Sequence, residues 1–412
     1  MVIIMLKGAI VIGQSGGPTA AINATLAGVI KGALKSDAIT KVYGMKNGIE
    51  GFLNENLIDL SEYFKEDAEK KIDILAATPA AALGSCRKKL PQPESDPAFF
   101  ENLIDLFKKY DVRYFFYIGG NDSMDTVAKI SAYLETVDYE MRVMGVPKTI
   151  DNDLQATDHT PGYGSAAKYI ATTMSEIIRD CAVYTIPAVT IVEIMGRDAG
   201  WLTAAAALSR IVNGVAPDLV YLPEVNFDNA AFIEKVKAAL STHPNVVVAV
   251  SEGIRYEDGT YVGEGTQSGV TDVFGHKYLA GTGKALEQLV KAEIGCKVRS
   301  VELNISQRCA AHIRSEADIS ESLGVGEAAV VNAVNGVSAS MMAMERAEDK
   351  YEISYVAKAI SGIANKVKTV PTEYICNDGS NVTDECLEYI LPMIQGEAKN
   401  YFENGLPVHI IF

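Results

Sequence analysis

Short apolar runs alternate along this chain with longer segments of helical periodicity, and no other feature constrains the fold as strongly. Each run is rich in Val, Ile or aromatic side chains, which is typical of a fully buried strand. The runs occupy residues 9–13, 113–118, 141–146, 188–195 and 246–250. Residues 274–294 show the i, i+3, i+4 spacing of an amphipathic helix. The alternation predicts an α/β fold in which mainly parallel sheets are flanked by helices.

Length and charge narrow the classes of protein to which this chain can belong. At about 150 residues per domain, its 412 residues favour two domains or one large one. The formal net charge of −16 argues against a nucleic-acid partner, because the phosphate backbone would be repelled. We expect no membrane insertion, since no apolar run reaches the roughly 18–20 residues that a bilayer requires. The cysteines are scattered without a CxxC motif, so we expect a cytoplasmic protein that needs no disulfides.

Two glycine-rich turns follow predicted strands. The first, GQSGGPT at residues 13–19, lets backbone N–H groups approach an anion, but an ordinary tight turn explains it equally well. It matches neither the GxGxxG nor the GxxxxGK[ST] motif. The second, IGGNDSMD at residues 118–125, adds polar side chains, although Asp122 or Ser123 would also serve simply as a helix cap. Because ligands bind at the carboxyl ends of parallel strands, both turns are candidate anion sites.

The segment GVPKTIDND at residues 145–153 carries the sharpest chemical signal. In an extended chain, Asp151 and Asp153 face the same side, and like charges held close need a metal, a proton or a cation between them. One carboxylate would then serve as general base while the other holds a divalent ion. Lys148 would neutralise developing phosphate charge. A surface turn rich in Asp and Asn is the alternative interpretation.

Further polar residues stand at the ends of apolar runs. Arg197 would clamp a phosphate with two hydrogen bonds, unless it pairs with its neighbour Asp198. Glu252 would accept hydrogen bonds from sugar hydroxyls, unless it is a solvated strand end. Polar side chains also flank a predicted strand at residues 301–305, namely Arg299, Gln307 and Arg308.

The remaining motifs exclude other chemistries. The five histidines show no metal-ligand spacing, and no GxSxG segment is present, so neither a zinc site nor covalent catalysis is indicated. We interpret Lys88 and Lys89 as a solvated basic face. Glycine pairs, one carboxylate pair and several cations at strand ends suit phosphoryl transfer between two anionic substrates.

Taken in chain order, these motifs resemble the phosphofructokinase family. The matching pieces are Gly16-Gly17, GSCR at 84–87, GGNDS at 119–123, PKTIDND at 147–153, MGR at 195–197 and Gln307-Arg308. The resemblance implies two Rossmann-like α/β domains with the active site in the cleft between them. We expect residues 1–155 to form the phosphoryl-donor domain and residues 156–310 the sugar-phosphate domain. Residues 311–412 carry no motif, and we expect a helical segment that completes the domains and supplies an oligomer contact.

The resemblance also implies a reaction, in which fructose 6-phosphate is phosphorylated at its 1-hydroxyl. Family members that use ATP usually carry glycine at the positions of Asp122 and Lys148, whereas the charged residues here resemble the pyrophosphate-dependent branch. A carboxylate at Asp122 would repel the α-phosphate of ATP, and Lys148 would supply a cation to the shorter donor. The predicted activity is therefore reversible transfer from pyrophosphate, giving fructose 1,6-bisphosphate and phosphate. An ATP-dependent enzyme and a non-catalytic sugar-phosphate sensor are the alternatives.

Carried over by position, the resemblance implies a role for each site residue. Asp151 is expected to be the general base, in a catalytic group with Lys148, Asp122 and Arg87. Asn121 and Asp153 would position Mg²⁺ directly or through water. The expected donor-binding residues are Gly16, Gly17, Arg87 and Lys148. The expected substrate-binding residues are Thr149, Asp151, Met195, Gly196, Arg197, Glu252, Arg299, Gln307 and Arg308. Because Arg299 in this family often comes from a neighbouring subunit, we expect a homodimer or a larger homo-oligomer.

Three positions depart from the family pattern. Asn121 stands where most members have Asp, so one negative charge is missing beside the metal. Ile305 replaces a His or Tyr that contacts the sugar phosphate, and Ala188 falls where ATP-dependent members often place a phosphate-binding Arg. The last two departures leave sedoheptulose 7-phosphate as an alternative acceptor.

Overall fold

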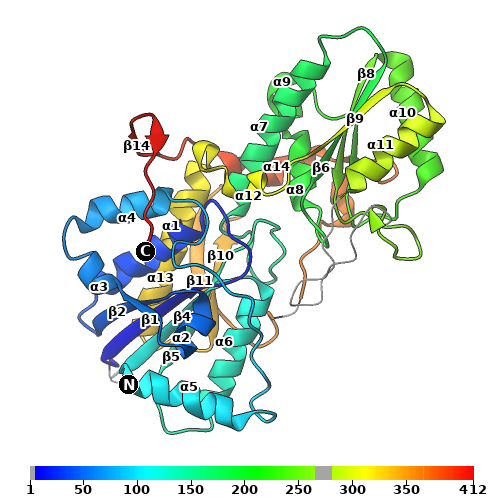
Figure 1. Cartoon of the computed structure of the whole chain (residues 1–412). Helices are drawn as coiled ribbons and strands as arrows, with labels where there is room; N and C mark the ends of the chain where they lie inside the picture. Colours follow the sequence, from blue (N-terminus) through cyan, green and yellow to red (C-terminus); the bar gives the residue numbers. More distant parts are fainter. Residues whose placement is uncertain (1–4, 265–280, 365) are drawn as a thin grey trace.

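The computed structural model describes residues 5–264, 281–364 and 366–412, which form two lobes, each built on its own sheet (Figure 1). The larger sheet contains, in spatial order, β11 (Ile353–Ala359), β10 (Ser340–Arg346), β5 (Arg142–Pro147), β4 (Val112–Gly119), β1 (Gly8–Gln14), β2 (Ile39–Met45) and β3 (Leu57–Asp59). The smaller sheet contains β7 (Leu219–Tyr221), β8 (Asn245–Ser251), β6 (Ala188–Ile194) and β9 (Lys297–Glu302). Neighbouring strands are parallel except in the pairs β10–β11 and β2–β3. Two small hairpins pair β12 (Ile375–Cys376) with β13 (Asn381–Val382) and β14 (Phe402–Glu403) with β15 (Leu406–Pro407).

Helices cover both faces of each sheet. In the larger lobe they are α1 (Ile22–Leu34), α2 (Gly48–Leu53), α3 (Leu60–Tyr63), α4 (Ala68–Ala77), α5 (Pro97–Lys109), α6 (Asn121–Leu134) and α13 (Glu316–Val334). The others are α7 (Tyr163–Cys181), α8 (Trp201–Ala205), α9 (Ser209–Asn213), α10 (Asn229–Thr242), α11 (Thr282–Glu293), α12 (Ser306–Cys309) and α14 (Asp384–Ile390). Short 3-10 helices occupy Ala206–Leu208, Ala311–Ile313, Thr372–Tyr374 and Leu391–Ile394. No helix in the described part of the chain combines the length and apolar character that crossing a membrane requires.

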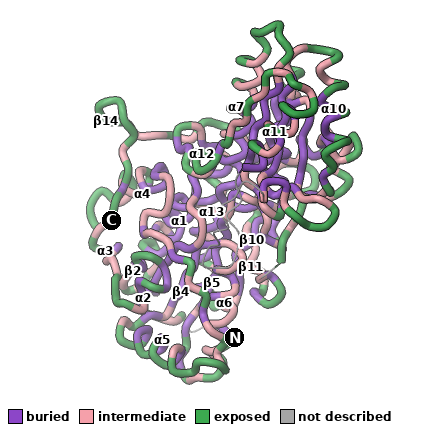
Figure 2. Tube along the Cα trace, turned by 45° about the vertical axis from the view of Figure 1, so that its right-hand side comes forward, coloured by how far each residue is buried: buried purple, intermediate pink, exposed green. Residues whose placement is uncertain are grey.

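Side-chain alternation along the strands builds a core on each face of a sheet. Ile10 and Ile12 of β1 pack in a cluster with α1 and α13, whereas Val11 between them packs in a second cluster with α5 and α6. Two further clusters lie on the two faces of the smaller sheet. Figure 2 shows the buried residues gathered along the sheets and the helix faces that contact them.

The predicted α/β fold with mainly parallel sheets is confirmed. The five predicted apolar runs correspond to β1, β4, β5, β6 and β8. These strands are apolar along nearly their whole length because both of their faces are covered. The predicted helix at residues 274–294 is confirmed as α11 from Thr282 onwards, while residues 274–280 lie outside the described residues.

The C-terminal hundred residues contribute strands as well as helices. Strands β10 and β11 extend the larger sheet beyond β5, and α13 packs along α1. The two helices approach closely, because a Cβ on Gly28 would lie only 2.1 Å from the Leu323 carbonyl oxygen. The sequence pattern predicts helices for residues 311–412 and does not reveal the two strands.

Candidate active site

The turn after β1 presents backbone groups at the carboxyl edge of the larger sheet. Gly16 has a φ of 78°, its N–H donates to Cys86 O over 3.3 Å, and its O accepts from Ser85 Oγ over 2.7 Å. A Cβ on Gly16 would lie 3.1 Å from Lys148 Nζ. Glycine is therefore favoured here both by the left-handed backbone and by the close approach of the ammonium.

Cations gather around this glycine turn. Lys148 follows β5 and is buried, and its Nζ donates to Gly17 O over 2.7 Å. Burial lowers the pKa of Lys148 to about 8, nearby carboxylates oppose that shift, and the charges of Arg87 and Arg308 lower the pKa further. Arg308, predicted on the sugar side, lies beside the turn, because a Cβ on Gly17 would be 3.7 Å from its Nη1. Such a concentration of positive charge suits a small, highly charged anion.

Helix α6 begins beside the same turn. Asn121 Nδ2 donates to Asp153 Oδ2 over 3.5 Å, and Asn121 Oδ1 is buried without a hydrogen-bond partner among the described residues. Asp122 lies in the first turn of α6, and its Oδ1 is 3.5 Å from Lys89 Nζ. The interpretation of Lys89 as part of a solvated face is therefore incomplete, since this exposed lysine forms an ion pair with the carboxylate that we expect to select the donor.

Two carboxylates meet on the segment 149–158, which we call the aspartate turn. Asn152 has a φ of 54°, so the chain is not extended and the geometry predicted from the sequence is wrong at this point. The Asp151 N–H donates to Thr149 Oγ1 over 3.1 Å. Burial raises the pKa of Asp151, and the charge of Asp153 raises it further. Burial also raises the pKa of Asp153, and the carboxylates are still close enough to interact, as predicted.

The ends of β6 and β8 contribute polar groups from the smaller lobe. The Gly196 N–H donates to Glu252 Oε1 over 3.3 Å, and the Met195 N–H donates to Gln307 Oε1 over 3.2 Å. Gln307 Nε2 is buried and has no hydrogen-bond partner within the described residues. Burial raises the pKa of Glu252 to about 8, and the charge of Asp151 raises it further. Groups from the two lobes therefore lie near enough to influence each other's protonation.

Arg197 belongs to the same cluster. Its positive charge lowers the pKa of both Asp151 and Glu252, although burial keeps both values raised. Arg255 Nη2 donates to the Arg197 carbonyl oxygen over 3.2 Å and forms an ion pair with Asp198. Arg255 thus braces the loop that carries Arg197.

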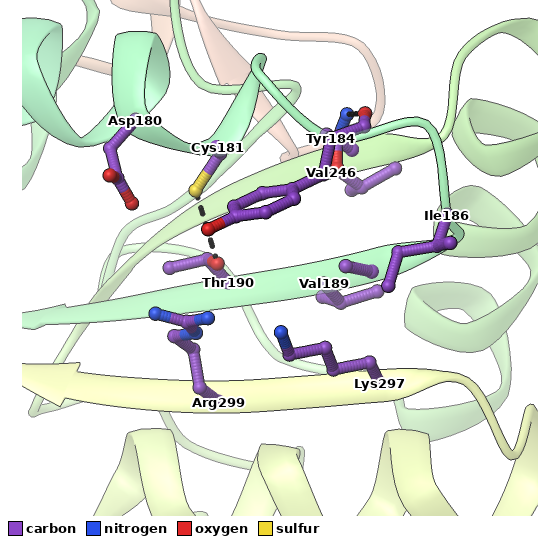
Figure 3. A pocket seen from close by; sticks show the side chains of 11 residues that line it. Asp180, Cys181, Tyr184, Ile186, Val189, Thr190, Val246, Lys297 and Arg299 are labelled. Carbon is purple, nitrogen blue, oxygen red and sulfur yellow. Dashed lines mark hydrogen bonds between the residues drawn. The ribbon is translucent and has the colours of Figure 1, made fainter.

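Arg299 lies away from these residues in its own chain. It pairs with Thr190 of β6, four residues before the last residue of that strand, a distance of about 13 Å along the strand. Figure 3 shows Arg299 with Lys297 in a separate pocket, under the end of α7 at Cys181 and beside Tyr184. The described chain therefore brings together the other predicted site residues but leaves Arg299 outside the cluster.

The oxygen atoms beside the aspartate turn suit a hard divalent cation. Asp151 and Asp153 supply carboxylates, and Asn121 Oδ1 is a buried acceptor without a partner in the described structure. No three His, Cys, Asp or Glu side chains gather as a metal-binding group within the described ranges. An ion here would therefore need oxygen atoms from substrate phosphates and water to complete its coordination, as Mg²⁺ usually does.

Sequence reasoning missed Lys368, which contacts the aspartate turn. Its Nζ donates to Asn152 Oδ1 over 3.2 Å, across a separation of 216 residues. No motif surrounds Lys368, so no local signal could have revealed this contact.

A glycine turn and cations that interact with two partly buried carboxylates define a phosphoryl-transfer enzyme. The chain belongs to the phosphofructokinase family, since residues 9–332 match the family described as Phosphofructokinase. It is 43% identical over 398 residues to the pyrophosphate--fructose 6-phosphate 1-phosphotransferase of Halomonas elongata, covering 96% of this chain and 93% of that protein. The protein of the same name from Xanthomonas campestris is also 43% identical, over 98% of this chain and 96% of its own length. The crystal structure of the pyrophosphate-dependent phosphofructokinase from Nitrosospira multiformis matches with a TM-score of 0.86 and 37% identity, covering 97% of this chain and 95% of that one.

Proposed function

We propose that this chain transfers a phosphoryl group reversibly from pyrophosphate to the 1-hydroxyl of fructose 6-phosphate. The products are fructose 1,6-bisphosphate and phosphate, which places the reaction in glycolysis or gluconeogenesis. The observation that carries the proposal is the buried ammonium of Lys148, which contacts the glycine turn and interacts with Asp151 and Asp153. Relatives named for this activity match the chain over nearly its whole length.

Asp122 and Lys148 support pyrophosphate as the donor. Asp122 places a carboxylate in the first turn of α6, beside the glycine turn, where a further phosphate of a nucleotide would be repelled. Lys148, Arg87 and Arg308 together surround a region suited to a short and highly charged donor. Pyrophosphate concentrates its charge in this way, whereas ATP must also place a nucleoside.

Asp151 is the proposed general base for the sugar hydroxyl. Its raised pKa brings a partly buried carboxylate closer to the working pH, which favours proton abstraction in the transition state. Lys148 and Arg197 lie close enough to stabilise the ionised carboxylate, and Lys148 also balances charge on the transferred group. The proton therefore moves from the 1-hydroxyl to Asp151 as the oxygen attacks the donor phosphorus, and the bridging P–O bond of pyrophosphate breaks to release phosphate.

Asp153 and Asn121 are the proposed residues for Mg²⁺. The buried Asn121 Oδ1 and the desolvated Asp153 carboxylate fit this ion by their chemistry. When bound, Mg²⁺ would withdraw charge from the phosphate oxygens. Asn121 in place of Asp leaves one negative charge fewer for holding the ion, so we expect a correspondingly weaker apparent affinity.

The smaller lobe is the proposed acceptor side. Its sugar-phosphate contacts would come from Thr149, Met195, Gly196, Arg197, Glu252 and Gln307. Gln307 Nε2 is a buried donor that needs an acceptor, and a substrate oxygen would supply one. Ile305 is exposed at the start of α12 and offers no hydrogen bond to a phosphate. Sedoheptulose 7-phosphate is therefore the acceptor to compare with fructose 6-phosphate.

We further propose that residues 1–155 form the donor domain, that residues 156–310 form the acceptor domain, and that the enzyme is a homodimer or a larger homo-oligomer. Arg299 supports the oligomer, because its pocket lies away from the site of its own chain. A second copy is the simplest source of an arginine at the 6-phosphate.

The test is fructose 1,6-bisphosphate formation with Mg²⁺, comparing pyrophosphate and ATP as donors. We expect turnover with pyrophosphate, and a loss of at least about a hundredfold in kcat for Asp151→Asn. Asp105→Asn, on the exposed face of α5, is the control and should retain full activity. Turnover with ATP alone would contradict the donor proposal. If neither fructose 6-phosphate nor sedoheptulose 7-phosphate is phosphorylated by pyrophosphate or ATP, a non-catalytic sensor is favoured.

A further inference from the structure

A late segment of the chain pairs with the aspartate turn. Val367 and Leu154 form an antiparallel bridge, and the Lys368 N–H donates to Asp153 O over 2.7 Å. The pairing holds the turn as a neighbouring strand would. The segment lies beyond residues 9–332, the part of the chain that matches the family.

The side chain of Lys368 contacts the same turn at separated points. Its Nζ donates to Asn152 Oδ1 over 3.2 Å, to Thr157 O over 3.4 Å and to Asp158 O. The ammonium also lies 5.4 Å from the ring centre of Trp201, whose Nε1 donates to Lys368 O over 3.1 Å. One side chain therefore bridges the start and the end of the turn, and it lies against the only tryptophan of the protein.

The conformation of Asn152 explains why this bridge matters. Asn152 is buried in a left-handed conformation, which asparagine adopts more readily than most residues, so the contacts of its buried amide decide how firmly the turn is held. Its Nδ2 donates to Tyr389 Oη over 3.4 Å, and that hydroxyl donates to Asp158 O over 2.6 Å. Both ends of the Asn152 amide therefore form hydrogen bonds inside the protein. Its neighbours Asp151 and Asp153 are the residues proposed as general base and Mg²⁺ ligand.

We propose that Lys368 is a positioning residue for phosphoryl transfer, which holds the aspartate turn in the shape that presents Asp151 and Asp153. This inference rests on the proposed function. Lys368 acts through Asn152 and the backbone, and removing its ammonium would leave buried oxygen acceptors without their donor. The turn would then relax, and a displacement of about 1 Å at reacting groups costs on the order of a hundredfold in rate.

Kinetics of three variants test this role. We expect Lys368→Met to lower kcat by about 10- to 100-fold while the KM for fructose 6-phosphate changes less than about threefold. Lys368→Arg keeps the charge and should recover kcat to within about tenfold of the wild type. Lys366→Met, at an exposed lysine two residues earlier, should behave as the wild type. A wild-type kcat in Lys368→Met, or an effect on KM alone, would overturn the proposal.

Amide hydrogen exchange and Trp201 emission test the same role without turnover. Lys368→Met should accelerate exchange across residues 149–158 by at least about tenfold, and Lys366→Met should leave it unchanged. Trp201 fluorescence emission should change in Lys368→Met and should stay as in the wild type in Lys366→Met. If the wild type is inactive with every donor, the proposed function fails, and the exchange result alone then decides whether Lys368 holds the turn. Unchanged exchange in Lys368→Met would overturn the positioning role.

A second variant covers the case in which Lys368→Met does not fold. Tyr389→Phe removes the other hydrogen-bond partner of the Asn152 amide and the donor to Asp158 O. It should also lower kcat with little change in KM and accelerate exchange across residues 149–158. Wild-type kinetics and exchange in Tyr389→Phe would overturn the claim that these contacts hold the turn.

Discussion

At the scale of the residue, a single carboxylate is expected to separate the two donors. Asp122→Asn removes the negative charge at the start of α6, so kcat/KM with ATP should rise by at least about tenfold. Asp125→Asn in the same helix is the matched control, since its carboxylate lies 2.7 Å from Lys129 instead. Initial rates with ATP and pyrophosphate measure the effect. No gain with ATP in Asp122→Asn would contradict the role of this residue in donor choice.

The pH dependence also belongs to single residues. Lys148 must carry its proton to attract pyrophosphate, and its pKa is lowered by burial to about 8. We therefore expect kcat/KM for pyrophosphate to fall as the pH rises through about 8. Asp151 must lose its proton to act as base, and because its pKa is raised by burial, kcat/KM should also fall on the acid side. A rate profile from about pH 5.5 to about 9.5 tests both limbs, and a flat alkaline limb would exclude Lys148 as the required cation.

At the scale of the element, the contact between α1 and α13 depends on a missing side chain. A Cβ on Gly28 would lie 2.1 Å from the Leu323 carbonyl oxygen, and backbone cannot easily move away. Gly28→Ala should therefore reduce the free energy of unfolding by about 1–3 kcal/mol, although alanine is the better helix former. Gly32→Ala is the comparison, because its Cβ would lie 3.1 Å from the side chain of Val330, and we expect a smaller loss. Urea unfolding of both variants measures the difference, and equal stability of Gly28→Ala and the wild type would contradict the close approach.

The elements also show what sequence could and could not predict. Buried parallel strands can be recognised in the sequence, because apolar residues must occupy both of their faces. The glycine turns could be located as well, since each comes directly after such a strand. Contacts between distant segments carry no such local signal. Lys89 reaches Asp122, Arg308 reaches Gly17, and Lys368 reaches Asn152 only after the chain has folded. The left-handed φ of Asn152 agrees with the alternative of a turn rich in Asp and Asn, but no local pattern indicated that Asn152 is buried rather than on the surface.

At the scale of the whole molecule, Arg299 needs a second copy of the chain if it is to reach the sugar phosphate. Arg299 pairs with Thr190 of β6, which lies about 13 Å along that strand from its carboxyl end, where the other site residues lie. Tyr184 and Ile186, which line its pocket, and nearby Val183 are exposed, as is typical of a surface that another subunit covers.

Mixing two inactive variants tests this arrangement. Asp151→Asn and Arg299→Ala should each have little activity alone. If Arg299 serves the neighbouring site, a hybrid dimer contains one site with both defects and one site with none. Random exchange makes about half of the dimers hybrid, so the mixture should recover about a quarter of the wild-type activity. If Arg299 serves its own chain, every site keeps one defect and mixing restores nothing. The recovered rate, measured after the two purified variants are mixed and allowed to exchange subunits, therefore distinguishes a site shared between subunits from one that a single chain completes.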